Sequence, residues 1–255
     1  MSEPSANPSA AKRWYHFVEG NTPCKRALFD ALGYQPHLGQ AAFHDSSARF
    51  KVLIAGTRFG KSLAAAREAL ALSMRIGSRG WIVAPSYRLA EKEFRYILSD
   101  LDALDTPFEV RKLGGHSGPS ILKTHWQSEV LTLSAQHPET LLGEEVDWML
   151  LSEASQLEGD TFARYLRGRL TSRGGALIVP TTPAGFNWVH ELYLRGADPA
   201  FPQWESWHFR TIDNPLIPAD EVEEARLTMP AERFREQYLG AFTSEHGFFF
   251  GDACV

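Results

Sequence analysis

The stretch "FKVLIAGTRFGKSLAAA", residues 50–66, decides how the rest of the chain is interpreted. An apolar run rich in β-branched residues ends at Ala55, four residues follow, and Gly60-Lys61-Ser62 opens an Ala-rich segment. A phosphate-binding loop needs a buried strand before it and a helix after it, and this pattern predicts both. The alternative is a chance match in a glycine-containing loop, which the correct placing of strand and helix disfavours.

The residue types in this loop suit a nucleoside triphosphate. Gly60 lets the backbone approach a phosphate, and consecutive N–H groups at a helix N-terminus supply positive potential. Lys61 can reach the β- and γ-phosphates, and the Ser62 hydroxyl can ligate Mg²⁺. The sequence therefore predicts ATP and Mg²⁺ as cofactors. The expected contacts in the loop are Ala55, Gly56, Thr57, Arg58, Phe59, Gly60, Lys61, Ser62 and Leu63.

A catalytic carboxylate is expected at the end of a neighbouring strand. Glu153 follows the apolar run 148–151 and there could polarise the attacking water. Ser152 stands where many ATPases have an aspartate, so it is a weaker Mg²⁺ partner, and either slow hydrolysis or help from a neighbour is expected. Asp147 lies at the other end of the same strand, roughly 16 Å away, and is expected to be a strand-start charge.

A third strand, within residues 174–185, ends in two hydroxyl residues, Thr181 and Thr182. These could hydrogen-bond the γ-phosphate or its attacking water. The alternative, a strand-end turn stiffened by Pro183, is equally compatible with the motif, and both interpretations stay open.

Apolar strand-like runs alternate with helix-like segments along the chain, which predicts a parallel sheet with helices on both faces. Strands are expected within 50–56, 80–85, 146–155, 174–185 and 204–211, with a hairpin in 106–133 and a strand-like tail after 241. Helices are expected within 13–34, 37–46, 61–77, 86–104, 159–170, 187–196 and 218–240, the last divided at Met229–Pro230.

Composition sets wider limits. The chain has 255 residues, 44% of them hydrophobic and 22% charged, which suffices for a real core. A net charge of -5 argues against a surface coated with basic residues. Its two cysteines, Cys24 and Cys254, suggest no disulfide framework, which fits a reducing cytoplasm. The polar residues 1–12 are expected to form a flexible arm, and no apolar run nears the ~20 residues that cross a bilayer.

Several segments resemble, in order, the motifs of the large terminase subunit of tailed bacteriophages, the ATP-driven DNA packaging motor. In the first of them Gln40 occupies the place of the family's adenine-sensing glutamine. The segment 179–196 resembles the one that couples hydrolysis to movement. The matching segments are 33–44, 55–62, 81–94, 146–155, 179–196, 209–217 and 232–242.

The resemblance implies an α/β fold, a RecA-like ASCE-type P-loop ATPase, over residues 13–245, with a small lid at about 207–245. Residues 246–255 would begin a linker to a nuclease domain that the chain lacks, since Asp252 alone makes no two-metal site. The implied function is an ATP-hydrolysing motor that translocates double-stranded viral DNA into the procapsid. The implied partners are DNA, the portal protein, the small terminase subunit and copies of the chain in a ring of five, in the host cytoplasm and without a membrane.

The chain departs from the family pattern at three positions. Ser152 replaces the family's aspartate, and Arg58 lies one position after the usual loop arginine, where this chain has Thr57. Leu142 stands where related members place a trans-acting arginine, a group worth ~10³–10⁵ in rate where it operates. The sequence suggests other arginines for this trans-acting role. Arg58 is one of them and is also a catalytic candidate; the others are Arg164, Arg167, Arg169 and Arg173.

Two basic groups are candidates for phosphate contacts with DNA: the four arginines of 164–173, and the trio Arg111, Lys112 and Lys123. For each, a solvated surface is an equal alternative. A helicase or repair translocase is disfavoured, because the chain has no room for a second RecA-like domain. A weakly hydrolysing nucleotide-binding module remains as the alternative function, supported by Ser152 and Leu142.

Overall fold

The computed structural model describes residues 17–244, except for 20–21, 114–117, 142 and 160. The expected arm 1–12, the expected linker 246–255 with Asp252, and Leu142 therefore lie outside the described residues.

The centre of the protein is an eight-stranded sheet in the order β10-β3-β9-β8-β4-β7-β6-β5. The first six strands of this order are parallel, and β6 and β5 extend the sheet as antiparallel strands. The strands are β3 (Phe50–Ala55), β4 (Arg79–Ala84), β5 (Phe108–Lys112), β6 (Ser120–Thr124), β7 (Glu129–Ser134), β8 (Trp148–Leu151), β9 (Ala176–Thr181) and β10 (Trp204–Phe209).

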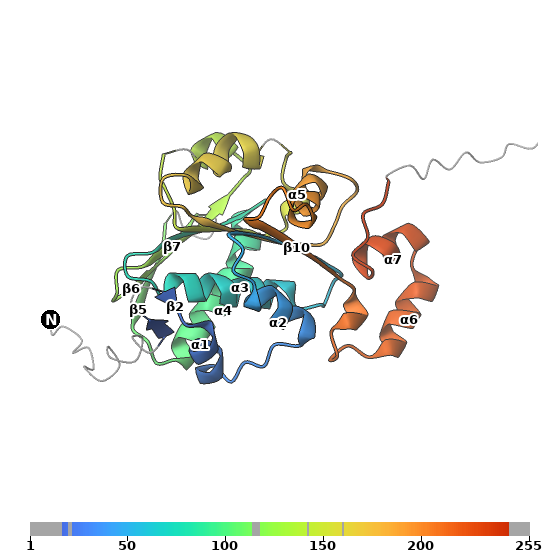
Figure 1. The fold of residues 1–255 in the computed structure, drawn as a ribbon, viewed down its shortest axis with the longest axis horizontal. Helices are drawn as coiled ribbons and strands as arrows, with labels where there is room; N and C mark the ends of the chain where they lie inside the picture. Colours follow the sequence, from blue (N-terminus) through green and yellow to red (C-terminus); the bar gives the residue numbers. More distant parts are fainter. Residues whose placement is uncertain (1–16, 20–21, 114–117, 142, 160, 245–255) are drawn as a thin grey trace, which may run out of the picture.

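Helices cover both faces of the sheet, as the burial of a parallel sheet requires. Figure 1 shows α1 to α4 on one face, α5 on the other, and α6 with α7 beyond the β10 edge. The helices are α1 (Lys25–Ala31), α2 (Leu38–Asp45), α3 (Lys61–Ser73), α4 (Tyr87–Ala103), α5 (Trp188–Ala197), α6 (Ala219–Thr228) and α7 (Ala231–Gln237). None of the described helices has the length and apolar character needed to cross a membrane.

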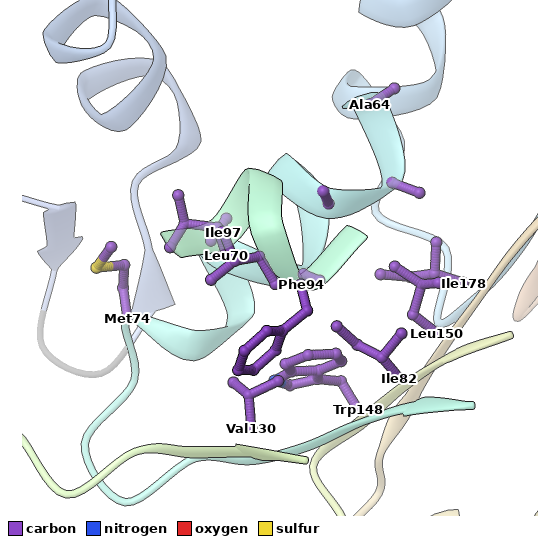
Figure 2. Close-up of a cluster of buried hydrophobic side chains, with 14 of the residues drawn as sticks. Ala64, Leu70, Met74, Ile82, Phe94, Ile97, Val130, Trp148, Leu150 and Ile178 are labelled. Atoms are coloured by element: carbon purple, nitrogen blue, oxygen red, sulfur yellow. The ribbon is translucent and has the colours of Figure 1, made fainter. Parts of the chain in front are cut away.

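The core forms two layers because side chains alternate between the faces of each strand. In β3, Leu53 packs with the α3 and α4 layer, whereas Val52 and Ile54 pack with the α5 layer. Figure 2 shows the first layer, in which Trp148 lies beside Phe94. This arrangement confirms the predicted fold class, a P-loop-type α/β fold with a mainly parallel sheet.

The predicted helix 13–34 is wrong at its start. Residues Val18–Glu19 (β1) and Thr22–Pro23 (β2) pair as antiparallel strands, and the helix begins only at Lys25. Proline has no backbone N–H and fits a helix only in its first turn, so Pro23 ends the hairpin instead of continuing a helix.

The hairpin arrangement predicted for 106–133 is present, and its last strand, β7, stays paired with β6 and also pairs in parallel with β4. Two further predictions need correction. The predicted helix 159–170 is irregular, with a π-helix at Thr161–Leu166 followed by a 3₁₀ helix at Arg167–Leu170. The predicted strand-like tail shows no strand in its described part, residues 241–244. The division of the last helical segment at Met229–Pro230 is confirmed.

Candidate active site

The loop between β3 and α3 turns sharply at its last residue. Gly60 has a φ of 98°, in the left-handed region, and a Cβ at this position would lie 2.7 Å from the Gln40 amide nitrogen. Only glycine meets both conditions without strain. The turn places Lys61 and Ser62 at the N-terminus of α3, as a phosphate-binding loop requires.

One side of the loop is held by α2. Gln40 Nε2 donates to the Gly60 carbonyl at 3.2 Å, and Gln40 Oε1 accepts from the His37 N–H at 3.3 Å. The His37 ring lies 3.1 Å from the Phe59 carbonyl. Gln40 is buried and does not line the cavity described below, so its present contacts are with the loop backbone.

The other side of the loop is held by the segment that follows β10. The Thr57 N–H donates to the Gln237 carbonyl at 2.6 Å, and the Thr211 hydroxyl donates to the Thr57 carbonyl at 2.7 Å. Asn214 Nδ2 donates to the Arg58 carbonyl at 2.8 Å. The end of β10 and the helix α7 therefore share backbone contacts with the loop.

A cavity of about 600 Å³ opens in front of the loop. The carboxyl ends of β3, β9 and β8 meet at this edge of the sheet, the usual position of ligand sites in parallel sheets. Its lining residues are Thr57, Arg58, Gly60, Lys61, Ser62, Leu63, Leu89, Lys92, Tyr96, Glu153, Ser155, Gln156, Thr182, Pro183, Ala184 and Gln237.

This cavity unites most of the residues expected at the site. Glu153, Thr182, Thr57 and Arg58 line it together with the loop residues from Gly60 onward. The remaining expected residues, Gln40, Ala55, Gly56, Phe59 and Ser152, are buried behind the lining.

Lys61 faces the cavity from the start of α3 but is 8% exposed. Burial lowers the pKa of its ammonium, and the nearby carboxylates of Glu153 and Glu93 oppose that shift. A poorly solvated ammonium at a helix N-terminus gains strongly from an anionic ligand. The Ser62 hydroxyl lies beside it on the cavity wall, where it suits a hard cation bound to phosphate.

Glu153 adopts the left-handed conformation, with φ 50° and ψ 43°, two residues after the end of β8. Such a conformation is uncommon for a residue with a side chain, and it turns the chain sharply where the carboxylate meets the cavity. Its Oε1 lies 3.7 Å from Lys92 Nζ, a cation on α4 that the sequence did not identify.

Hydrogen bonds join the ends of β8 and β9. The Ser155 hydroxyl donates to the Thr182 carbonyl at 2.8 Å and lies 3.0 Å from the Thr181 hydroxyl. Asn187 Nδ2 donates to the Ser155 carbonyl at 3.1 Å. Thr181 is therefore committed to this network, and of the two threonines only Thr182 lines the cavity.

Behind the cavity, Ser152 and Glu93 are each 1% exposed. Among the described residues, Ser152 Oγ and Glu93 Oε2 have no hydrogen-bond partner of normal geometry. Burial raises the pKa of the Glu93 carboxyl, and the hydroxyls of Ser152 and Ser62 lie close enough to oppose that shift. One signal in the sequence points to this group, because Leu89, Lys92, Glu93 and Tyr96 recur at helical spacing along one face of α4.

The arginines suggested for the trans-acting role lie at two different places in the fold. Arg58 lines the cavity and is exposed. Arg167 lies over the Phe50 ring at the start of β3, and Arg173 pairs with Asp147 at the start of β8. These strand starts are at the opposite edge of the sheet from the loop, so neither arginine reaches the cavity of its own chain.

Two more basic residues of the 164–173 group, Arg164 and Arg169, do not line the cavity either. In the second basic group each cation pairs with a carboxylate: Arg111 with Glu109, Lys112 with Glu91, and Lys123 with Glu129.

The sequence of this chain was compared with those of known proteins. No protein-family model matches this sequence. The terminase large subunits of Thermus phage G20c and Escherichia phage T5 are 31% and 28% identical to it, over 85% and 81% of this chain. The matches cover 50% and 47% of those two proteins, so the chain spans about half the length of these curated relatives.

Solved structures agree. A large terminase from a thermophilic bacteriophage, solved with ADP, shares the fold at 14% identity and a TM-score of 0.66, over 81% of this chain and 53% of that one. The large terminase ATPase domain of Thermus phage P74-26 is 30% identical, with a TM-score of 0.73 over 84% of this chain and 97% of that one. This chain therefore belongs to the phage large terminase family, as an ATPase domain of that family.

Proposed function

We propose that this domain binds ATP with Mg²⁺ and hydrolyses it to drive double-stranded viral DNA into the procapsid. The observation that carries the proposal is that Lys61 and Glu153, from the loop and from the neighbouring acidic strand, line a single cavity. A charge-stabilising cation and a candidate general base on one cavity suit phosphoryl transfer to water.

The residues have separate tasks in this proposal. Lys61 and the loop N–H groups bind the phosphates, and Ser62 holds Mg²⁺, which when bound neutralises charge on the phosphate oxygens. Glu153 orients a water and accepts its proton. Lys92, 3.7 Å from Glu153 Oε1, holds that carboxylate near the cavity. Thr182 contacts the terminal phosphate or the water.

The lid at about 207–245, within an ATPase domain of residues 13–245, is proposed to transmit the nucleotide state. The contact of Gln237 with Thr57, and that of Asn214 with Arg58, supports this proposal, because movement of the loop would be felt directly by the segment after β10. Arg58, exposed at the cavity, is the proposed source of an arginine in the site.

The partners proposed for the motor are double-stranded DNA, the portal protein, the small terminase subunit and further copies of the chain in a ring, expected to number five. Support comes from the names of its relatives, which are terminase large subunits of phages. The place of action would be the host cytoplasm.

The experiment is an ATPase assay on the full chain with Mg²⁺, with and without double-stranded DNA and portal protein. Lys61→Ala should abolish turnover. Glu153→Gln should leave nucleotide binding intact and lower turnover by at least about 10²-fold, the lower range for a general base. Glu145→Gln, a carboxylate outside the cavity, serves as the matched control. Turnover retained in Glu153→Gln would mean that another group acts as the base.

A weakly hydrolysing nucleotide-binding module is the second candidate, because Ser152 supplies no carboxylate at the usual acidic position. Nucleotide binding without DNA-stimulated turnover, at concentrations that allow a ring to form, would favour this module over the motor.

A further inference from the structure

The position before Glu153 raises a question that the proposed function leaves open. In many ATPases the residue directly before the catalytic acid is an aspartate, whose negative charge orders the water shell of Mg²⁺. In this chain that residue is Ser152. A hydroxyl provides no charge, and a divalent cation prefers a site with carboxylates nearby.

A carboxyl group does reach this place, from another element. Glu93 lies on α4, one residue after Lys92, four residues after Leu89 and three before Tyr96, all of which line the cavity. Helical geometry puts these residues on one face. The Glu93 side chain is buried behind that face, where the hydroxyls of Ser62 and Ser152 both act on it.

The surroundings of Glu93 do not explain it as a structural residue. Buried carboxylates are normally paired or fully hydrogen-bonded. Among the described residues, however, Glu93 Oε2 and Ser152 Oγ have no hydrogen-bond partner of normal geometry, although both are buried and the Ser152 hydroxyl lies close to the Glu93 carboxyl. Two unsatisfied polar atoms close to Ser62 indicate that a bound ligand completes their hydrogen bonding.

Two other carboxylates on α4 have partners. Asp100 accepts two hydrogen bonds from Arg67, at 3.0 and 3.1 Å, and Glu91 pairs with Lys112 and Arg95. Glu93 is thus distinguished from these two neighbours on the same helix, because it faces the phosphate loop with one carboxylate oxygen unsatisfied within the described part of the chain.

We propose that Glu93 supplies, from α4, the carboxylate that Ser152 lacks, and that it positions the Ser62 hydroxyl and the water shell of Mg²⁺. This inference rests on the proposed function. Glu93 is a positioning residue in this scheme: it acts through Ser62 and ordered water, and Glu153 remains the base. The Ser152 hydroxyl accepts or donates a hydrogen bond among Glu93, Ser62 and this water.

The test measures Mg²⁺ dependence and needs no turnover. A fluorescent ATPγS analogue is titrated against the full chain at increasing Mg²⁺, and the Mg²⁺ concentration that gives half of the affinity gain is recorded. Glu93→Gln should raise that concentration about 10–100-fold, the usual effect of losing a residue that supports a metal ligand. Its affinity for the analogue in EDTA, without Mg²⁺, should change little. Glu91→Gln, on the same helix, should leave it unchanged.

A rescue by a second substitution shows whether Glu93 positions the Mg²⁺ site or only packs against its neighbours. Adding Ser152→Asp to Glu93→Gln returns a carboxylate to the usual position and should restore Mg²⁺ dependence to within a few-fold of the original chain. Glu93→Ala is the second variant should Glu93→Gln not fold, with the same expected loss. Folding of each variant is checked by circular dichroism.

The outcomes are distinct. Wild-type Mg²⁺ dependence in a folded Glu93→Gln or Glu93→Ala protein would overturn the inference alone, as would a loss that Ser152→Asp does not restore. No analogue binding by the original chain would overturn the proposed function and with it this inference. Loss followed by rescue supports both.

Discussion

Gln40 is a buried amide with one defined task in this structure. It holds the Gly60 carbonyl at the end of the phosphate loop, and its own oxygen is held by His37. The amide therefore fixes the turn that presents Lys61.

The first prediction concerns Gln40→Ala. Losing this hydrogen bond should weaken nucleotide binding by about 1 kcal/mol, roughly a fivefold rise in Kd, and equally for ATP and GTP. Competition binding with both nucleotides measures the effect, and Gln35→Ala, an exposed glutamine nearby, is the control. A loss for ATP alone would instead assign Gln40 the adenine-sensing role that the family resemblance implies.

Single residues also mark the limit of what the sequence could predict at the site. The loop and Glu153 were predictable because each follows an apolar strand directly, and parallel strands end at one edge of a sheet. Glu93 could not be placed, because its role depends on how α4 packs across α3. Arg173, suggested as a trans-acting arginine, could not be placed either, since only the strand direction shows that it pairs with Asp147 at the far edge.

Between elements, packing of β4 against β8 depends on a glycine. Gly80 is directly opposite Trp148 in the register of the two strands. A Cβ at position 80 would lie 1.9 Å from the Trp148 ring, and Trp148 is fully buried in the layer that Figure 2 shows. The indole occupies the space that a side chain would take.

Gly80→Ala is therefore expected to destabilise the protein by about 1–3 kcal/mol or more, because the indole cannot move without displacing its buried neighbours. Urea unfolding followed by tryptophan fluorescence gives the change in the free energy of unfolding. Gly168→Ala, where a Cβ would meet nothing within 4 Å, should stay within about 0.5 kcal/mol. Equal effects at both positions would refute the packing argument.

Element order was largely predictable because strand-like runs and Ala- and Leu-rich helices alternate clearly. The errors have local physical causes. The first helix begins only after Pro23. The strand β7 keeps its hairpin partner β6 and pairs along its other edge, in parallel, with β4. The pairing of β7 cannot be read from periodicity, since periodicity reports burial and not the partner of a strand.

At the scale of the whole molecule, one buried carboxylate joins four elements. Glu68 of α3 accepts from His44 of α2 at 3.0 Å and pairs with Lys51 of β3 at 2.8 Å and Lys25 of α1 at 2.6 Å. His44 donates through Nδ1, which leaves Nε2 to accept from the Tyr34 hydroxyl at 3.3 Å. The first two helices are thus anchored to the sheet and to the helix that begins at the phosphate loop.

The protonation of this group links the fold to pH. Burial alone would raise the pKa of Glu68, but the hydrogen bond from His44 and the charges of Lys51 and Lys25 outweigh it and bring the pKa to about 2. Burial lowers the pKa of His44, and Glu68 opposes that shift only partly. Burial also lowers the pKa of Lys51 to about 8, against the pull of Glu68, so it stays charged at neutral pH.

Acid should therefore destabilise the protein in two steps. The folded pKa of His44 is below its unfolded value, so its contribution is complete above pH 6.5 and is lost as pH falls through the folded pKa. Glu68 contributes about 3 kcal/mol above pH 4.5, lost as pH falls toward 2.

Glu68→Gln tests this assignment, because it leaves Lys51 and Lys25 without their shared anion. Breaking a buried ion pair from one side typically costs about 3–5 kcal/mol at neutral pH. The variant should also have a shallower acid-dependent slope below pH 4.5, while Glu224→Gln, exposed on α6, should keep the original one. Urea unfolding at a series of pH values from about 7 to about 3 measures both. A Glu68→Gln protein with the original slope would show that another carboxylate controls acid stability, and that the anchoring of α1 and α2 does not depend on the charge of Glu68.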